Sequence, residues 1–129
     1  MNKGQRLYKF ILGLLMPFLF LACSSKERIK IDGGTFNVDG KDVQLICGEM
    51  HYARIPHEYW RDRLKRARAM GLNTISVYVF WNFHERQPGE FDFSGQADVA
   101  EFVRLAQEEG LYVILRPGPY ACAEWDFGG

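Results

Sequence analysis

The chain has 129 residues, with 16 basic and 16 acidic side chains, 47% hydrophobic residues and three cysteines. A net charge of zero provides no cationic surface for nucleic acid, and three cysteines are too few to define a small disulfide-rich protein. One quarter of the residues are charged and no segment is of low complexity, so length and composition indicate a single globular domain.

The first 22 residues have the pattern of an export signal. Three basic residues and no acidic one precede the apolar segment 10–21, whereas a membrane-spanning helix needs about 20 apolar residues. A short buried helix is the alternative, and Pro17 argues against it. Residues 1–22 are therefore expected to be a signal peptide, which leaves a mature chain, 23–129, with a net charge of −3.

The end of this signal resembles that of a bacterial lipoprotein. In residues 21–25 (LACSS), a small residue precedes Cys23, which would become the new N-terminus and the site of lipid attachment. Phe20 departs from the usual Leu, so ordinary signal cleavage is the alternative. We expect an exported protein in the cell envelope of a bacterium, on its periplasmic or outer-membrane face, that meets the membrane only through this lipid.

Residues 29–46 are predicted to form three short antiparallel strands joined by two turns. Asp32-Gly33 and Asp39-Gly40 each lie between alternating apolar residues, which indicates hairpins because glycine accepts positive φ.

Two helices are predicted, at residues 57–70 and 95–109. Gly71 and Gly110 end them, and Ser94 is a plausible N-cap of the second helix. Apolar residues recur at helical spacing on one face of each, namely Trp60, Leu64 and Ala67, then Val99, Phe102, Val103 and Ala106. The basic residues of the first helix are expected to form a solvated face, on which Asp62 pairs with Arg66, and a binding patch is the alternative.

Each helix is followed by Gly-Leu and an apolar strand, and the two glycines lie 39 residues apart. This alternation predicts parallel strands with crossover helices. Alternate residues should face the helices: Ile75, Val77 and Val79, then Val113 and Leu115. The opposite face is more polar: Thr74, Ser76, Tyr78, Phe80 and Asn82, then Tyr112, Ile114 and Arg116.

This second face favours an α/β fold of the (β/α)₈ TIM-barrel type, with only the first three βα strands present after the short antiparallel segment. A polar face suits the lumen of a barrel, whereas both faces of an open doubly wound sheet would be apolar. The open sheet is the alternative, and it is weakened because residues 47–51 (CGEMH) lack the G-x-G-x-x-G spacing.

Three strand ends, residues 49–54, 78–85 and 116–126, combine aromatic rings with carboxylate, amide, imidazole and guanidinium groups. Sugars offer apolar faces and hydroxyl groups together, so a carbohydrate site is the natural inference. Arg116 should form a buried ion pair with Glu49 or Glu124. Trp125 is expected to pack at the rim of this site more readily than to bind a sugar directly.

Neither a metal nor a cofactor is expected. His51 and His84 belong to no H-E-x-x-H motif and could be structural histidines. Cys47 and Cys122 are 75 residues apart, a spacing that matches no metal-ligand pattern.

Five segments resemble, in order and spacing, the start of family 35 of the glycoside hydrolases, the β-galactosidases. They are residues 48–56 (GEMHYARIP), 60–64 (WRDRL), 71–75 (GLNTI), 78–85 (YVFWNFHE) and 116–125 (RPGPYACAEW). The resemblance implies a (β/α)₈ barrel and a retaining exo-enzyme that removes terminal β-linked galactose from glycans. It also implies that Tyr78 and Glu124 bind galactose hydroxyls and that Cys122 and Ala123 contact the sugar, partly through backbone. Phe80 stands where many members have Pro.

The resemblance assigns no catalytic residue to this sequence. In the family the two catalytic carboxyl groups come from Asn-Glu and Ser-Glu motifs after the fourth and seventh strands, and neither motif occurs before Gly129. We therefore expect this polypeptide alone to be inactive, as the N-terminal part of a longer enzyme. A non-catalytic, lipid-anchored protein that binds a sugar or a partner is the alternative.

Overall fold

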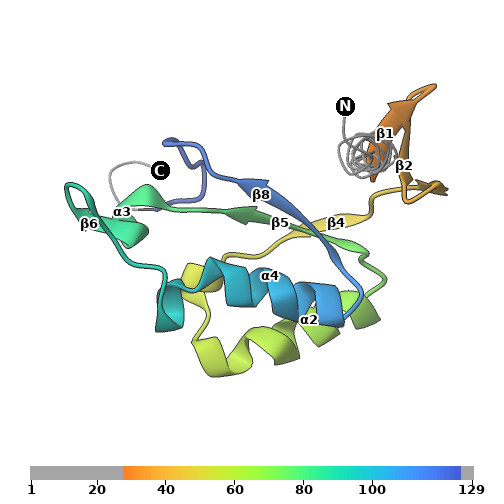
Figure 1. Ribbon diagram of the computed structural model, residues 1–129. Coiled ribbons are helices and arrows are strands. Elements are labelled where there is room, and N and C mark those ends of the chain that lie inside the picture. The colour runs from red at the N-terminus through yellow and green to blue at the C-terminus, as the bar shows by residue number, and fades with distance from the viewer. Residues whose placement is uncertain (1–27, 126–129) are drawn as a thin grey trace, which may run out of the picture. The chain divides into compact units, whose positions relative to one another are not determined.

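The computed structural model describes residues 28–125, in two compact units divided between Gln44 and Leu45 (Figure 1). The predicted signal peptide and Cys23 lie outside the described residues. Within the described part of the chain, no helix combines the length and apolar content that crossing a bilayer requires.

The first unit contains an antiparallel sheet of three strands, as predicted: β1 (Ile29–Asp32), β2 (Thr35–Val38) and β3 (Lys41–Val43). Asp32 pairs with Thr35, so the first turn is Gly33-Gly34, one residue later than predicted. Both residues of each turn have positive φ, which two-residue hairpin turns of this kind require. The backbone preference of the glycine pair therefore fixes the register of β1 on β2.

The second unit contains three parallel strands in the order β4 (Cys47–Glu49), β5 (Thr74–Tyr78) and β8 (Tyr112–Arg116). Helix α2 (Trp60–Ala69) connects β4 to β5, and α4 (Val99–Glu108) lies between β5 and β8 in the chain. Both helices lie on the same side of this sheet (Figure 1). The predicted parallel, crossover-connected strands are confirmed, and the unit is a mixed α/β structure.

The core of this unit lies between the sheet and the two helices. Its buried members are Tyr52, Trp60, Leu64, Ala67, Ile75, Val77, Phe102, Leu105, Ala106 and Leu111. The predicted helix-facing residues of β5 are therefore confirmed at Ile75 and Val77, and Val113 of β8 is partly buried against the same core. Leu115 was predicted to face the helices, but it is 46% exposed because the core ends before the carboxyl end of β8.

Helix α2 begins at Trp60, after a 3₁₀ turn at His57–Tyr59, and Gly71, with φ of +94°, follows its end. Its three predicted core residues are buried. The predicted ion pair is also present: Arg66 Nε donates to Asp62 Oδ2 at 2.8 Å.

The predicted start of the second helix is wrong. A 3₁₀ turn at Gly95–Ala97 precedes α4, and Asp98 is the N-cap, with its Oδ1 accepting from the Glu101 amide at 2.8 Å. The Ser94 hydroxyl instead donates to Asp92. Leu105 joins Phe102 and Ala106 on the buried face of the helix, and Val103 is only partly buried.

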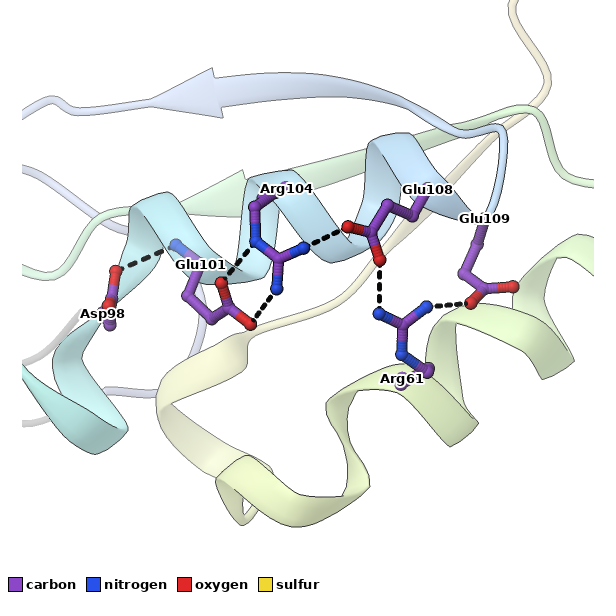
Figure 2. A network of polar contacts seen from close by, with 6 residues as sticks. All are labelled: Arg61, Asp98, Glu101, Arg104, Glu108 and Glu109. Atoms are coloured by element: carbon purple, nitrogen blue, oxygen red, sulfur yellow. Dashed lines mark hydrogen bonds and ion pairs between the residues drawn. The ribbon is translucent and has the colours of Figure 1, made fainter.

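Ion pairs join the outer faces of the two helices (Figure 2). Arg61 of α2 donates to Glu109 at 2.6 Å and also to Glu108, and Arg104 donates to Glu101 and Glu108 within α4. The guanidinium groups of Arg61 and Arg104 lower the pKa values of Glu108 and Glu101, respectively. The basic face of α2 is thus solvated and partly paired, as predicted.

Beyond β5, the chain forms the short helix α3 (Trp81–His84) and the hairpin of β6 (Glu85–Gln87) and β7 (Glu90–Phe91). His84 is buried, donates from Nδ1 to the Asp92 carbonyl at 2.8 Å and accepts at Nε2 from the Tyr52 hydroxyl. With both ring nitrogens paired, His84 is a structural histidine, as the sequence allows.

Candidate functional site

The three parallel strands bring their carboxyl ends to one edge of the sheet. The register pairs Cys47 to Glu49 with Thr74 to Ser76, and pairs Tyr78 with Arg116. Parallel pairing therefore gathers Glu49, Tyr78 and Arg116, which are distant in sequence, at this edge.

Arg116 links the ends of all three strands. Its Nη1 donates to Glu49 Oε1 at 2.8 Å, its Nη2 donates to the Tyr78 hydroxyl, and its Cζ lies 3.7 Å from the centroid of the Tyr78 ring. The predicted ion pair is therefore present, with Glu49 as the partner. The predicted burial is wrong, because 42% of the Arg116 side chain and 44% of the Glu49 side chain are exposed.

Tyr78 lies on the face of β5 opposite the helices, in a second cluster of buried residues with Phe80 and Ala123. Tyr78 is 5% exposed. Two of the predicted sugar-binding residues, Tyr78 and Ala123, are thus packed into the same cluster although 45 residues separate them in the chain.

Arg54, from the 3₁₀ turn Tyr52–Arg54 after β4, holds the loop that carries the other predicted site residues. Its guanidinium donates to the carbonyl oxygens of Ala123 and Glu124, the latter at 2.7 Å, and lies 5.2 Å from the Trp125 ring centroid. Reasoning from the sequence did not assign Arg54 a role. The feature of the sequence that indicates a role for Arg54 is its position just after the end of a parallel strand.

Trp125 fixes the far end of the same loop. Its ring stacks on Phe80 with centroids 4.1 Å apart, and its Nε1 donates to Asn82 Oδ1 at 2.7 Å. Phe80 and Trp125 therefore pack against each other, and the position of Trp125 at the rim of a sugar site stays a prediction.

Glu124 and Cys122 are exposed on this loop, on either side of the buried Ala123. Glu124 has φ of +44°, a left-handed conformation that costs a non-glycine residue about 1–2 kcal/mol. Within residues 28–125, no side chain or backbone amide donates a hydrogen bond to the Glu124 carboxylate. A hydrogen bond with Cys122 raises the pKa of the Tyr120 phenol.

His51 lies beside the Tyr78 ring. Its ring centroid is 5.7 Å from that of Tyr78 and 5.4 Å from that of Phe80, and its Nε2 is 4.0 Å from Glu49 Oε1. Its buried Nδ1 has no hydrogen-bond partner among the described residues. Burial lowers the pKa of His51 and outweighs the opposing effect of Glu49, which favours a neutral imidazole beside the Arg116 guanidinium.

The edge thus combines an anchored phenol, a carboxylate that accepts no hydrogen bond from the described residues, and aromatic rings. A sugar requires this pairing of polar and apolar groups. Among residues 28–125, no three His, Cys, Asp or Glu side chains are grouped in a way that could hold a metal ion.

Comparisons with known proteins agree with the resemblance noted in the sequence. The model of the glycosyl hydrolases family 35 matches residues 35–129. A beta-galactosidase of Xanthomonas manihotis is 54% identical over 118 residues, which cover 92% of this chain and 20% of that protein. A beta-galactosidase of Bos taurus is 57% identical over 123 residues, which cover 90% of this chain and 19% of that protein. The chain therefore spans about a fifth of the length of these curated relatives.

Two solved structures share this fold. One is the beta-galactosidase of the psychrophilic Marinomonas ef1, with a TM-score of 0.50 and 25% identity over 56% of this chain and 11% of that one. The other is an endogalactoceramidase, with a TM-score of 0.54 and 23% identity over 67% of this chain and 21% of that one.

Proposed function

Because this chain belongs to the glycosyl hydrolases of family 35, we propose that it is part of a β-galactosidase, a retaining exo-enzyme that removes terminal β-linked galactose from glycans. The curated relatives that are about 50% identical over most of the chain carry the name beta-galactosidase. The alternative of a non-catalytic binding lipoprotein finds no support among these relatives.

We propose that β4, β5 and β8 are the first three strands of a (β/α)₈ barrel. Their parallel pairing in chain order, with α2 and α4 on one face, supports this arrangement. In a barrel the other face of β5, which carries Tyr78 and Phe80, would look into the lumen, and the carboxyl ends of the strands would form the mouth where substrates bind.

The observation that carries the proposal is the shared position of Tyr78 and the loop 122–124. Tyr78 and Ala123 pack together, and Arg54 holds the carbonyl oxygens of Ala123 and Glu124. We propose that Tyr78 and Glu124 bind galactose hydroxyls and that Cys122 and Ala123 contact the sugar, partly through backbone. The left-handed conformation of Glu124 supports this role, because strained residues concentrate at functional sites.

We assign neither catalytic carboxyl group to this chain. Retaining hydrolysis needs a nucleophile and an acid/base about 5–5.5 Å apart. Glu124 is assigned to binding, and Glu49 is already paired with Arg116.

The protein is also proposed to be exported and lipid-anchored at Cys23. The support is the basic and apolar pattern of residues 1–21 and the LACSS motif that follows.

The test of function uses the protein that the complete gene encodes, with a chromogenic β-galactoside as substrate. We expect hydrolysis that initially releases β-galactose, detected by NMR, since retention preserves the anomeric configuration. Failure to hydrolyse any β-galactoside, or initial release of α-galactose, would contradict the proposed activity or its retaining course.

Glu124→Gln tests the binding role in the same protein. A hydrogen bond to a charged group contributes about 1.5–3 kcal/mol, so we expect kcat/KM to fall about 10- to 100-fold with an unchanged melting temperature. Glu90→Gln, on the exposed strand β7, is the matched control and should leave the kinetics unchanged. If Glu124→Gln behaves like this control, the assigned role is wrong.

A further inference from the structure

Arg116 lies in the hydrogen-bond network at the strand ends, and its side chain can only donate hydrogen bonds. A guanidinium group has five N–H donors and no acceptor. Both contacts of Arg116 must therefore be donations, one from Nη1 to Glu49 Oε1 at 2.8 Å and one from Nη2 to the Tyr78 hydroxyl oxygen.

The hydrogen bond from Arg116 leaves the hydroxyl proton of Tyr78 available. A phenolic hydroxyl has one proton to donate, and its oxygen can accept as well. Because Arg116 donates to this oxygen, the proton of Tyr78 remains free for another acceptor. Among the described residues, none is found in hydrogen-bonding position to accept it.

The Tyr78 ring is also fixed in place. The Arg116 guanidinium lies 3.7 Å from its centroid, and the rings of His51 and Phe80 lie 5.7 and 6.1 Å away. With the ring held among these groups, the phenolic oxygen has a set position at the sheet edge, and rotation about the C–O bond is its remaining freedom.

We propose that Arg116 is a positioning residue. Held by Glu49, its guanidinium donates a hydrogen bond to the Tyr78 oxygen and thereby turns the phenolic proton toward a bound galactose. The galactose oxygen that faces Tyr78 accepts this proton in a hydrogen bond. The role rests on the proposed function, because it takes galactose as the ligand. Glu49 acts indirectly: its ion pair with Arg116 keeps the planar guanidinium group oriented toward the Tyr78 oxygen.

The network predicts that Arg116 and Tyr78 act as one unit. Residues of one hydrogen-bond network show non-additive effects when both are changed. We expect Arg116→Met and Tyr78→Phe each to weaken galactose binding about 10-fold, because one misdirects and the other removes the hydrogen bond from the phenol to the sugar. The double variant should bind within about 3-fold of Tyr78→Phe, since Arg116 then has no hydroxyl to orient.

The experiment measures the inhibition constant of galactose, KM, kcat and the melting temperature for the protein that the complete gene encodes. Arg116→Lys keeps the charge without the planar fork, so it should bind galactose with an affinity between those of the wild type and Arg116→Met. Arg66→Met is the matched control, because Arg66 also pairs with a single carboxylate but lies on the outer face of α2. It should leave all kinetic constants unchanged.

Two results overturn the proposal in different ways. Additive effects of Arg116→Met and Tyr78→Phe, in a protein that hydrolyses β-galactosides, would remove the positioning role and leave the proposed function intact. A wild-type protein that neither binds galactose nor hydrolyses β-galactosides would remove both. Should Arg116→Met fail to fold, the same cycle with Arg116→Lys decides between additive and non-additive behaviour.

Discussion

Tyr52 shows how a single residue of the sequence segment 49–54 takes a structural role. It is fully buried in the core, and its hydroxyl donates to His84 Nε2. Its carbonyl oxygen accepts from Trp60 Nε1 at 3.1 Å and from Gln96 Nε2 at 2.9 Å. Burial raises the pKa of the Tyr52 phenol, which therefore stays protonated and able to donate. Tyr52 thus belongs to the support of the site.

Tyr52→Phe tests this role. The change leaves the buried His84 Nε2 without a donor, which costs about 1–3 kcal/mol of unfolding free energy. Urea denaturation followed by circular dichroism measures this loss. The control is Tyr59→Phe, at an exposed position, where we expect a change below about 0.5 kcal/mol. Equal stabilities of the two variants would show that the Tyr52 hydroxyl contributes nothing.

Helix α4 shows how the start of an element is decided. Ser94 and Asp98 are both residue types that favour an N-cap, and the sequence pattern favoured Ser94. The 3₁₀ turn at Gly95–Ala97 separates Ser94 from the helix, so the amide of Glu101, which has no partner within the helix, is satisfied by Asp98. The helix then packs with Leu105 in the core and Val103 at its border.

Asp98→Ala removes this cap. Loss of an N-cap side chain costs about 1 kcal/mol, so we expect a lower midpoint of thermal or urea unfolding. Ser94→Ala should destabilise the protein by less than half of this amount, because the Ser94 side chain bonds only the exposed Asp92. The reverse order of the two variants would restore Ser94 as the cap and contradict a helix that starts after Asp98.

On the scale of the whole molecule, the second unit separates support from binding. The helix-facing side of its sheet packs into the hydrophobic core, and the opposite side of β5 carries the cluster of Tyr78, Phe80 and Ala123. The loop that contains Cys122 and Glu124 is held to this side by Arg54 and Trp125. The proposed sugar site is therefore built from the ends of all three strands, and the helices pack on the opposite face of the sheet and stabilise it.

The proposed membrane anchor also belongs to this scale. If Cys23 carries the lipid, Cys23→Ala in the complete protein should move it from the membrane fraction to the soluble fraction of an expressing bacterium. Cys47→Ala is the matched control, because Cys47 is an exposed free cysteine outside the proposed site, and it should remain with the membrane. An unchanged distribution of Cys23→Ala would exclude lipid attachment at this position.

Local patterns determined much of this protein from the sequence by itself. Helical spacing identified the buried face of α2, alternation identified Ile75 and Val77 as helix-facing, and glycine-containing turns identified the three-stranded sheet. These features follow from backbone geometry over a few residues, which the sequence contains directly. The motifs near Tyr78 and Glu124 likewise indicated the family, and the family match over residues 35–129 confirms it.

Only the tertiary structure decided which distant groups meet. It selected Glu49 as the partner of Arg116, brought Arg54 to the carbonyl oxygen of Glu124, and left Leu115 partly exposed beyond the core. Each of these outcomes depends on distances between groups that lie far apart in the chain or on where the packed core ends. Periodicity carries no information about such distances, because it describes neighbours along the chain, whereas hydrogen bonds and burial are set by neighbours in space.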